Sequence, residues 1–163
     1  MRVLLISANR EMLPDPVAPI GLAYVAAAIK KAGHNVSILD LCLSDAIEGA
    51  IKDEIKAYNP EVIGISIRNI DNVSYPNSIS YISAIKDVVD TCKESSNAKI
   101  VLGGSGFTIM PEMLLDSLKA DFGIIGEGEE TFPELLEKIR KYLPLSSIME
   151  RLHLKSILPL HTI

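Results

Sequence analysis

Short runs of β-branched and aliphatic residues alternate with longer segments of helical composition along most of this 163-residue chain. The runs predict strands at Val3–Ser7, Val36–Asp40, Glu61–Ser66, Lys99–Gly104 and Asp121–Gly126. The segments between and after them predict helices at Ala18–Gly33, Ser44–Tyr58, Asn77–Ser95, Pro111–Lys119 and Glu129–Tyr142. This alternation constrains the fold strongly, because strands joined by helices pair in parallel through right-handed crossovers.

The predicted strands lack strict alternation of apolar and polar residues, which is typical of strands buried on both faces of a sheet. We therefore expect an α/β fold, a doubly wound five-stranded parallel sheet of the flavodoxin-like or Rossmann-like kind, formed by residues 1–142. Ser44 is the expected N-cap of the second helix. Residues 143–163 do not continue the pattern, and we expect either a lone helix over Ser146–Ile157 or a poorly ordered tail.

Composition and charge exclude several classes of protein. The net charge of -5 argues against a nucleic-acid partner and against an anionic membrane surface. The longest apolar run, Val17–Ile29, is shorter than the roughly 20 residues that span a bilayer, and we expect a cytoplasmic protein. Cys42 and Cys92 form no zinc or iron–sulfur motif, and we expect both to be buried as small hydrophobic residues. We expect Tyr24 in the core and His34 in a solvated turn.

Three glycines at and just after the end of the fourth predicted strand indicate a ligand at the carboxyl ends of the sheet, where doubly wound folds bind their ligands. Gly103, Gly104 and Gly106 would let a bulky, flat, neutral ligand approach the backbone, and a plain strand–helix turn is the alternative. On the first interpretation, Gly104→Val abolishes ligand binding and leaves the fold mostly intact.

Phosphate-containing ligands match the chain poorly. It has neither the GxxxxGK[ST] motif of a P-loop nor GxGxxG directly after the first strand. Glu127, Glu129 and Glu130 would repel an anion at the start of the last helix, where they complement the helix dipole. The strand ends also lack the aspartate and lysine of a receiver domain.

Polar residues follow the third and fourth predicted strands. Ser66 and Ser105 are candidates to hydrogen-bond a heterocycle or an amide, and a cap on a local turn is the alternative for each. Arg68, Asn69 and Asp71 form a polar cluster in the loop after the third strand. Either they contact a ligand, or an Arg–Asp pair orders the loop.

Four stretches of this sequence together resemble the N-terminal cobalamin (B12)-binding domain of B12-dependent radical SAM proteins. They are PIGLAYVAAAIKKAGHNVSILD, IGISIRNID, VLGGSGFTIMPE and ADFGIIGEGEETFPELL, in the family's order and spacing over Arg2–Tyr142. The resemblance implies that the nucleotide tail of cobalamin is buried in the crevice above the sheet, beside Gly103 and Gly104, with Ser66 as the hydroxyl after the third strand. The corrin ring would lie across the strand ends. The residues implied to line the tail pocket or the corrin are Pro19, Ile20, Gly21, Arg68, Asn69, Phe107, Gly126 and Glu127.

The chain departs from other B12 domains in one respect, because Ser7–Pro19 contains no histidine and hence no DxHxxG motif. We therefore expect base-off cobalamin without a protein histidine ligand. Weakly ligated cobalt changes its redox state more easily, which suits methyl transfer.

The chain also lacks the CxxxCxxC motif of the radical SAM cluster, so we expect it to hold no iron–sulfur cluster and not to be catalytic alone. The resemblance implies a cofactor-binding module, a fragment or half of a split enzyme, with a radical SAM domain or subunit as its partner. Two alternatives stay open. One is a non-enzymatic interaction domain with a vacant or degenerate pocket, and the other is a flavin in the same crevice.

Overall fold

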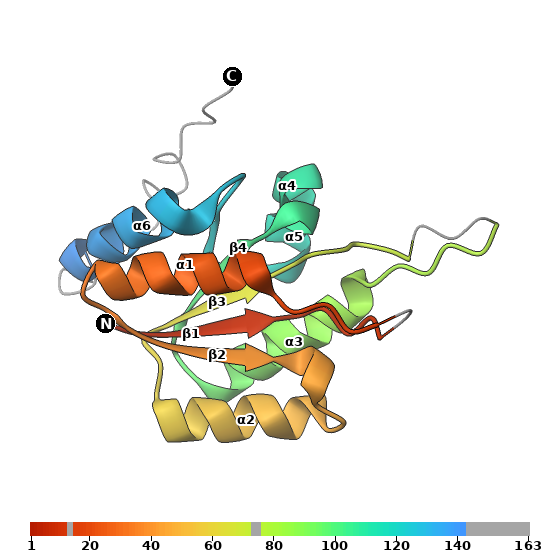
Figure 1. The fold of residues 1–163 in the computed structure, drawn as a ribbon, viewed down its shortest axis with the longest axis horizontal. Helices are drawn as coiled ribbons and strands as arrows, with labels where there is room; N and C mark the ends of the chain where they lie inside the picture. Colours follow the sequence, from red (N-terminus) through yellow and green to blue (C-terminus); the bar gives the residue numbers. More distant parts are fainter. Residues whose placement is uncertain (13–14, 73–75, 143–163) are drawn as a thin grey trace.

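A computed structural model describes residues 1–12, 15–72 and 76–142 of the chain (Figure 1). Its strands are β1 (Arg2–Ser7), β2 (Asn35–Asp40), β3 (Val62–Ser66), β4 (Lys99–Gly103) and β5 (Phe122–Gly123). Its helices are α1 (Ile20–Lys31), η1 (Leu41–Leu43, a 3-10 helix), α2 (Ile47–Tyr58), α3 (Ile82–Ser95), α4 (Ser105–Ile109), α5 (Pro111–Leu118) and α6 (Gly128–Tyr142). The tail predicted at residues 143–163 lies outside the described residues.

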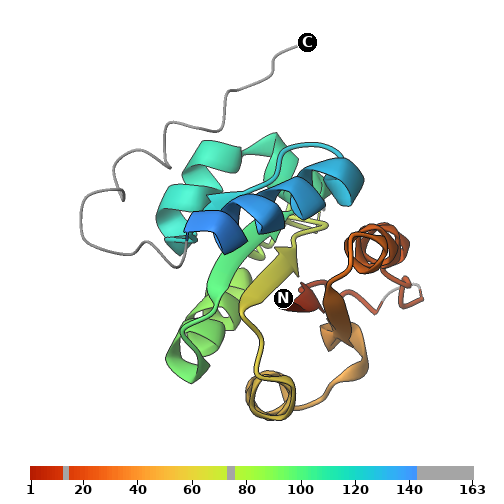
Figure 2. The same ribbon diagram turned by 90° about the vertical axis from the view of Figure 1, so that its left-hand side faces the viewer.

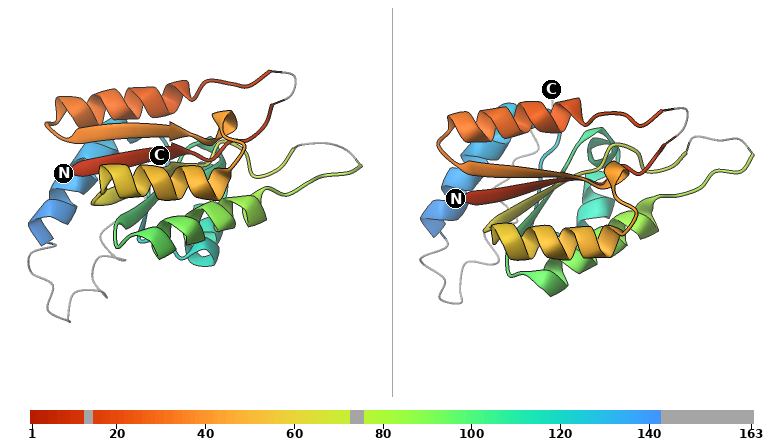
Figure 3. Two further views of the ribbon diagram at one scale, coloured as in Figure 1. Left: turned by 90° about the horizontal axis from the view of Figure 1, so that it is seen from below. Right: turned by 60° about the horizontal axis from the view of Figure 1, so that its bottom comes forward.

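The five strands form one parallel sheet in the order β2-β1-β3-β4-β5. Helices α1 and α6 lie on one side of this sheet, and α2 and α3 lie on the other (Figure 2). The predicted doubly wound α/β fold is thereby confirmed. The chain leaves β1 in one direction along the sheet and returns to build β3, β4 and β5 in the other, so the topological switch point lies between β1 and β3. Figure 3 shows that the connections after β1 and after β3 leave the sheet at the same edge.

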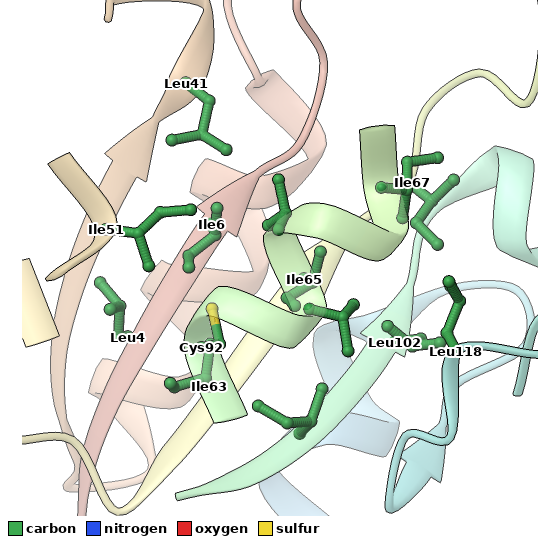
Figure 4. Close-up of a cluster of buried hydrophobic side chains, with 14 of the residues drawn as sticks. Leu4, Ile6, Leu41, Ile51, Ile63, Ile65, Ile67, Cys92, Leu102 and Leu118 are labelled. Atoms are coloured by element: carbon green, nitrogen blue, oxygen red, sulfur yellow. The ribbon is translucent and has the colours of Figure 1, made fainter. Parts of the chain in front are cut away.

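Successive side chains of a strand point to opposite faces of the sheet, so the apolar residues of the strands form two clusters, one on each face. These clusters hold the helices against the sheet. Leu4, Ile6, Ile63 and Ile65 face α2 and α3, where Cys92 packs among them (Figure 4). The residues on the other face belong to the cluster formed with α1 and α6, and they include Val3, Leu5, Val62 and Val101.

Several element boundaries differ from those predicted. Ser44 does not cap α2, which begins at Ile47; instead Ser44 ends η1, and its backbone N–H donates to the backbone oxygen of Leu41, the first residue of η1. Helix α3 begins at Ile82 rather than at the predicted Asn77, and Ser80 pairs with Asp71 in an antiparallel bridge. Strand β5 is paired over only two residues, Phe122–Gly123, because it lies at the edge of the sheet and leaves it early.

Two predictions about side-chain environment are wrong. Tyr24 is 64% exposed on α1 rather than in the core. His34 is buried, with its side chain only 1% exposed, because α6 packs over the turn after α1. The Met1 amine donates to its Nδ1 at 3.2 Å, and Glu137 Oε1 lies 3.5 Å from its Nε2. Burial and the neighbouring amine lower the pKa of His34 below its usual 6.5.

Both cysteines are free and buried, as predicted. Burial raises the pKa of the Cys92 thiol to about 12. Within residues 1–12, 15–72 and 76–142, no helix is long and apolar enough to cross a membrane.

Candidate functional site

A cavity of about 450 Å³ opens at the carboxyl ends of β1, β3 and β4, on the face of the sheet that carries α1 and α6. It lies at the switch point between β1 and β3, where doubly wound folds place their ligands. Its volume falls within the roughly 300–1,000 Å³ that is usual for small-molecule sites.

The floor of the cavity is a row of small residues, because three strands end in register. Ser7 of β1 pairs with Ser66 of β3, and Ser66 pairs with Gly103 of β4. Strand alternation turns all three toward α1 and α6, since Leu5 and Val101, two residues earlier on their strands, belong to the cluster on that face. Neither serine hydroxyl bonds to another described residue, so both are available to a ligand. Ser7 was missed in the sequence, although the alignment of parallel strand ends would have located it.

Gly64 lies one row deeper, between Leu5 and Val101. A Cβ added to Gly64 would lie 2.7 Å from both Leu5 Cδ2 and Phe132 Cε1. The ring of Phe132 therefore rests directly on the backbone of β3. A glycine inside a β-branched strand is a known sign of such a close approach, and it could have identified this position in EVIGIS.

The side walls come from α1 and from the start of α6. Pro19, Ile20 and Gly21 contribute from the first turn of α1. Gly128 brings α6 against α1, since an added Cβ would meet Val25 Cγ2 at 3.0 Å. The cavity is therefore a slot enclosed between the sheet and two helices that touch.

Polar groups gather at the mouth of the slot. Asn9, which follows β1, has a buried amide nitrogen without a hydrogen-bond partner among the described residues. Arg68 follows β3, and its backbone oxygen accepts a hydrogen bond from Ser105 Oγ at 3.0 Å. Glu127 and Glu129 stand at the start of α6, so the described residues contribute one guanidinium and two carboxylates to the mouth.

The three glycines at and after the end of β4 have different roles. Gly103 faces the cavity, and an added Cβ would make only ordinary contacts with Ile124, at 3.8 Å and 3.9 Å. Gly104 has a φ of 95°, and its added Cβ would lie 2.7 Å from the backbone oxygen of Ile67. A Cβ added to Gly106 would similarly lie 2.9 Å from the backbone oxygen of Arg68. Gly104 and Gly106 are therefore required by the turn itself, and the prediction that Gly104→Val leaves the fold mostly intact is wrong.

Most of the predicted site residues line this cavity: Pro19, Ile20, Gly21, Ser66, Arg68, Gly103, Gly104, Ser105 and Glu127. Asn69 instead lines a smaller neighbouring cavity of about 280 Å³, beside Tyr81 and Glu11. Gly106, Phe107 and Gly126 lie outside both.

Phe107 is 1% exposed and packs in the cluster on the other face of the sheet, where its ring covers Gly123. Gly126, with a φ of 76°, donates its N–H to Thr108 Oγ1 at 3.0 Å and so joins the loop before α6 to α4.

Within the part of the chain that the structure describes, no group of three His, Cys, Asp or Glu side chains could hold a metal ion. The described ranges contain a single histidine, His34, which lies at the opposite end of the strands from the cavity.

Comparison with known proteins agrees with this arrangement. The family model for the B12 binding domain matches residues 7–136. Tryptophan 2-C-methyltransferase of Streptomyces laurentii is 27% identical over 151 residues, which cover 92% of this chain and 24% of that protein. Cytidylyl-2-hydroxyethylphosphonate methyltransferase of Streptomyces wedmorensis is 29% identical over 143 residues, which cover 76% of this chain and 25% of that protein.

Among solved structures, the radical S-adenosylmethionine methyltransferase TsrM of Kitasatospora setae, with cobalamin and a [4Fe-4S] cluster bound, superimposes with a TM-score of 0.81. The two sequences are 27% identical, and the match covers 86% of this chain and 24% of TsrM. This chain thus spans about a quarter of the length of these relatives. It belongs to the B12-binding domain family and is similar to the cobalamin-binding region of radical SAM methyltransferases.

Proposed function

We propose that this chain binds cobalamin in its base-off form, with the nucleotide tail in the slot between the sheet and helices α1 and α6. The observation that carries the proposal is the floor of that slot, where Ser7, Ser66 and Gly103 align at the strand ends. A floor of two hydroxyls and one bare backbone lets a flat heterocycle lie close to the sheet. Larger side chains in this row would fill the space.

The corrin ring would then lie outside the slot, across the carboxyl ends of β1, β3 and β4. Asn9 and Arg68 stand at that edge and border both cavities. The unpartnered amide nitrogen of Asn9 would gain an acceptor from the amide groups around a corrin, and a buried donor without a partner is costly. The fit is therefore chemical as well as geometric.

Among the residues that the structure describes, the position of the histidine supports binding without a protein histidine ligand. The connection from Ser7 to Pro19 contains none, and His34 lies at the far end of the strands. An imidazole must come within about 2 Å of a metal to ligate it, and His34 is too far from the cavity to do so.

When bound, cobalamin supplies a cobalt centre that carries a methyl group. The role of this chain is to hold the tail, to orient the corrin and to exclude water from the slot. The two cysteines of the sequence are buried and fifty positions apart, so the cluster that starts radical chemistry would come from a radical SAM domain or subunit beyond these residues.

The test is a titration of the purified chain with hydroxocobalamin, followed by desalting and visible absorption spectroscopy. We expect a retained corrin with a base-off spectrum. Gly103→Val should lose binding and stay folded, because its side chain would enter the slot beside Ile124 without a steric clash. Gly49→Ala, in α2 on the other side of the sheet, is the matched control and should bind like wild type.

Two results would contradict the proposal. A folded chain that retains no corrin would favour the alternative of an interaction domain with a vacant pocket. Wild-type affinity in Gly103→Val would place the cofactor elsewhere on the molecule.

A further inference from the structure

The inner end of the slot differs chemically from its mouth. Its floor is the row Leu5, Gly64 and Val101, and the ring of Phe132 closes it from α6. The side chains of Leu5, Val101 and Phe132 are all buried, and the backbone groups of this row are paired between the parallel strands. Among the described residues, the inner end thus presents only apolar side chains and no free hydrogen-bonding group.

Hydrogen-bonding groups appear one row further out. The hydroxyls of Ser7 and Ser66 flank the mouth, next to Gly103. A ring that enters the slot therefore meets polar partners along its outer half and only hydrocarbon along its inner half. The affinity of a ring system should therefore depend on the polarity of its leading edge, which is the edge that enters the slot first.

We infer that the slot selects among cobamides, the relatives of cobalamin that differ in the base of the nucleotide tail, which is called the lower base. The slot favours a lower base with an apolar leading edge, such as dimethylbenzimidazole, over a purine such as adenine. This inference rests on the proposed function, since it requires the nucleotide tail to occupy the slot. It assigns Gly64, Phe132 and Val101 as the residues that determine the preference. Phe132 also sets the depth of the slot, because its ring rests on Gly64.

Burial of unpaired polar atoms is the physical reason for this preference. The two methyl groups of dimethylbenzimidazole would meet the apolar surface that Leu5, Val101 and Phe132 contribute to the slot. The amino group and ring nitrogens of adenine would instead lose their water without gaining a partner. One buried unpaired group of this kind weakens binding by about tenfold to a hundredfold.

The test compares three corrinoids on the purified wild-type chain by absorption titration: hydroxocobalamin, the adenine-containing cobamide, and cobinamide, which has no nucleotide tail. We expect hydroxocobalamin to bind about tenfold to a hundredfold more tightly than the adenine cobamide. Cobinamide should bind more weakly than hydroxocobalamin, since it leaves the slot without a ligand.

The outcomes separate this inference from the proposed function. Failure of all three corrinoids to bind would overturn the proposed function and the inference with it. Equal affinity for hydroxocobalamin and the adenine cobamide would overturn the inference alone. Equal affinity for cobinamide and hydroxocobalamin would also overturn it, because the tail would then contribute nothing.

A matched pair of variants locates the preference. Val101→Thr places a hydroxyl at the inner end of the slot, and Val62→Thr makes the same change in the same apolar cluster, outside the residues that line the cavity. We expect Val101→Thr to narrow the ratio of the two affinities by about threefold to tenfold, as one new hydrogen bond would. Val62→Thr should leave the ratio unchanged. If a folded Val101→Thr keeps the wild-type ratio of the two affinities, the assignment of Val101 is overturned. If this variant fails to fold, the ratio measured on the wild-type chain still decides whether the preference exists.

Discussion

Gly103 and Gly104 stand next to each other at the end of β4. Alanine at these two positions should change the protein's free energy of unfolding in opposite directions. Gly103 has no positive φ, and an added Cβ would come no closer than 3.8 Å to other residues. Gly104 has a φ of 95° and a ψ of 171°, a region that is open essentially only to glycine. Its added Cβ would lie 2.7 Å from Ile67 O, which also accepts the N–H of Gly106 at 2.9 Å and so cannot withdraw freely.

The expected magnitudes follow from these two geometries. Gly103→Ala should raise the free energy of unfolding by about 0.4–1 kcal/mol, because it reduces the freedom of the unfolded chain. Gly104→Ala should lower it by about 1–3 kcal/mol through its backbone conformation alone, before the contact with Ile67 is added. The two variants should therefore differ by at least about 1.4 kcal/mol, a substantial part of the roughly 5–15 kcal/mol that stabilises a domain.

Urea unfolding followed by far-ultraviolet circular dichroism measures this difference without any cofactor. We expect a higher midpoint for Gly103→Ala and a much lower one for Gly104→Ala, with similar slopes. Gly49→Ala serves as a control for the general gain from glycine to alanine in a helix, since its added Cβ would meet only Ala46. Equal midpoints for the two neighbouring variants would refute the described turn between β4 and α4.

Three further predictions concern stability and reactivity away from the cavity. The pKa of His34 is lower in the folded protein than its usual 6.5 in the unfolded chain. As the pH falls through 6.5, the unfolded chain therefore binds a proton before the folded protein does. The contribution of His34 to the free energy of unfolding should thus be full at neutral pH and should fall as the pH falls further. The urea midpoint of wild type should thus fall more between about pH 7.5 and 5.5 than that of His34→Gln, and parallel curves would contradict this. Lys119 has a φ of 51°, in the left-handed region, so Lys119→Gly should raise the free energy of unfolding by about 1 kcal/mol. Asn59 has a φ of 50°, and Asn59→Gly should give a smaller gain because asparagine tolerates the left-handed conformation. In the Cys42→Ala variant, Cys92 should react with Ellman's reagent only on unfolding, since burial raises its thiol pKa to about 12; rapid reaction of the folded protein would show that the thiol is accessible.

The order and type of the main elements could be predicted from local composition. Strands β1 to β4 are short runs of β-branched and aliphatic residues, and the long helices are amphipathic segments. Both signals depend on neighbours within a few residues. The short helix α4 was not predicted, because Gly104 and Gly106 disfavour a helix in isolation. Contacts of that segment with the backbone of Ile67 and Arg68, almost forty positions earlier, allow the helix to form.

His34 shows the same limit in another part of the molecule. Its sequence neighbours, a glycine and an asparagine, predict an exposed turn. Its burial is decided by α6, which begins almost a hundred positions later and brings Glu137 to the imidazole. A local pattern carries no information about contacts of that separation.

The sequence by itself determined the fold class, the family resemblance, and the fact that small and polar residues follow β3 and β4. The tertiary structure alone decided which of these residues face a ligand. Parallel register brought Ser7 beside Ser66 and Gly103, while the loop after β3 occupied the space next to Gly104 and Gly106. Closure of the slot by Phe132 over Gly64 likewise needed α6 to return across the sheet, because a cavity exists only where distant segments meet around it.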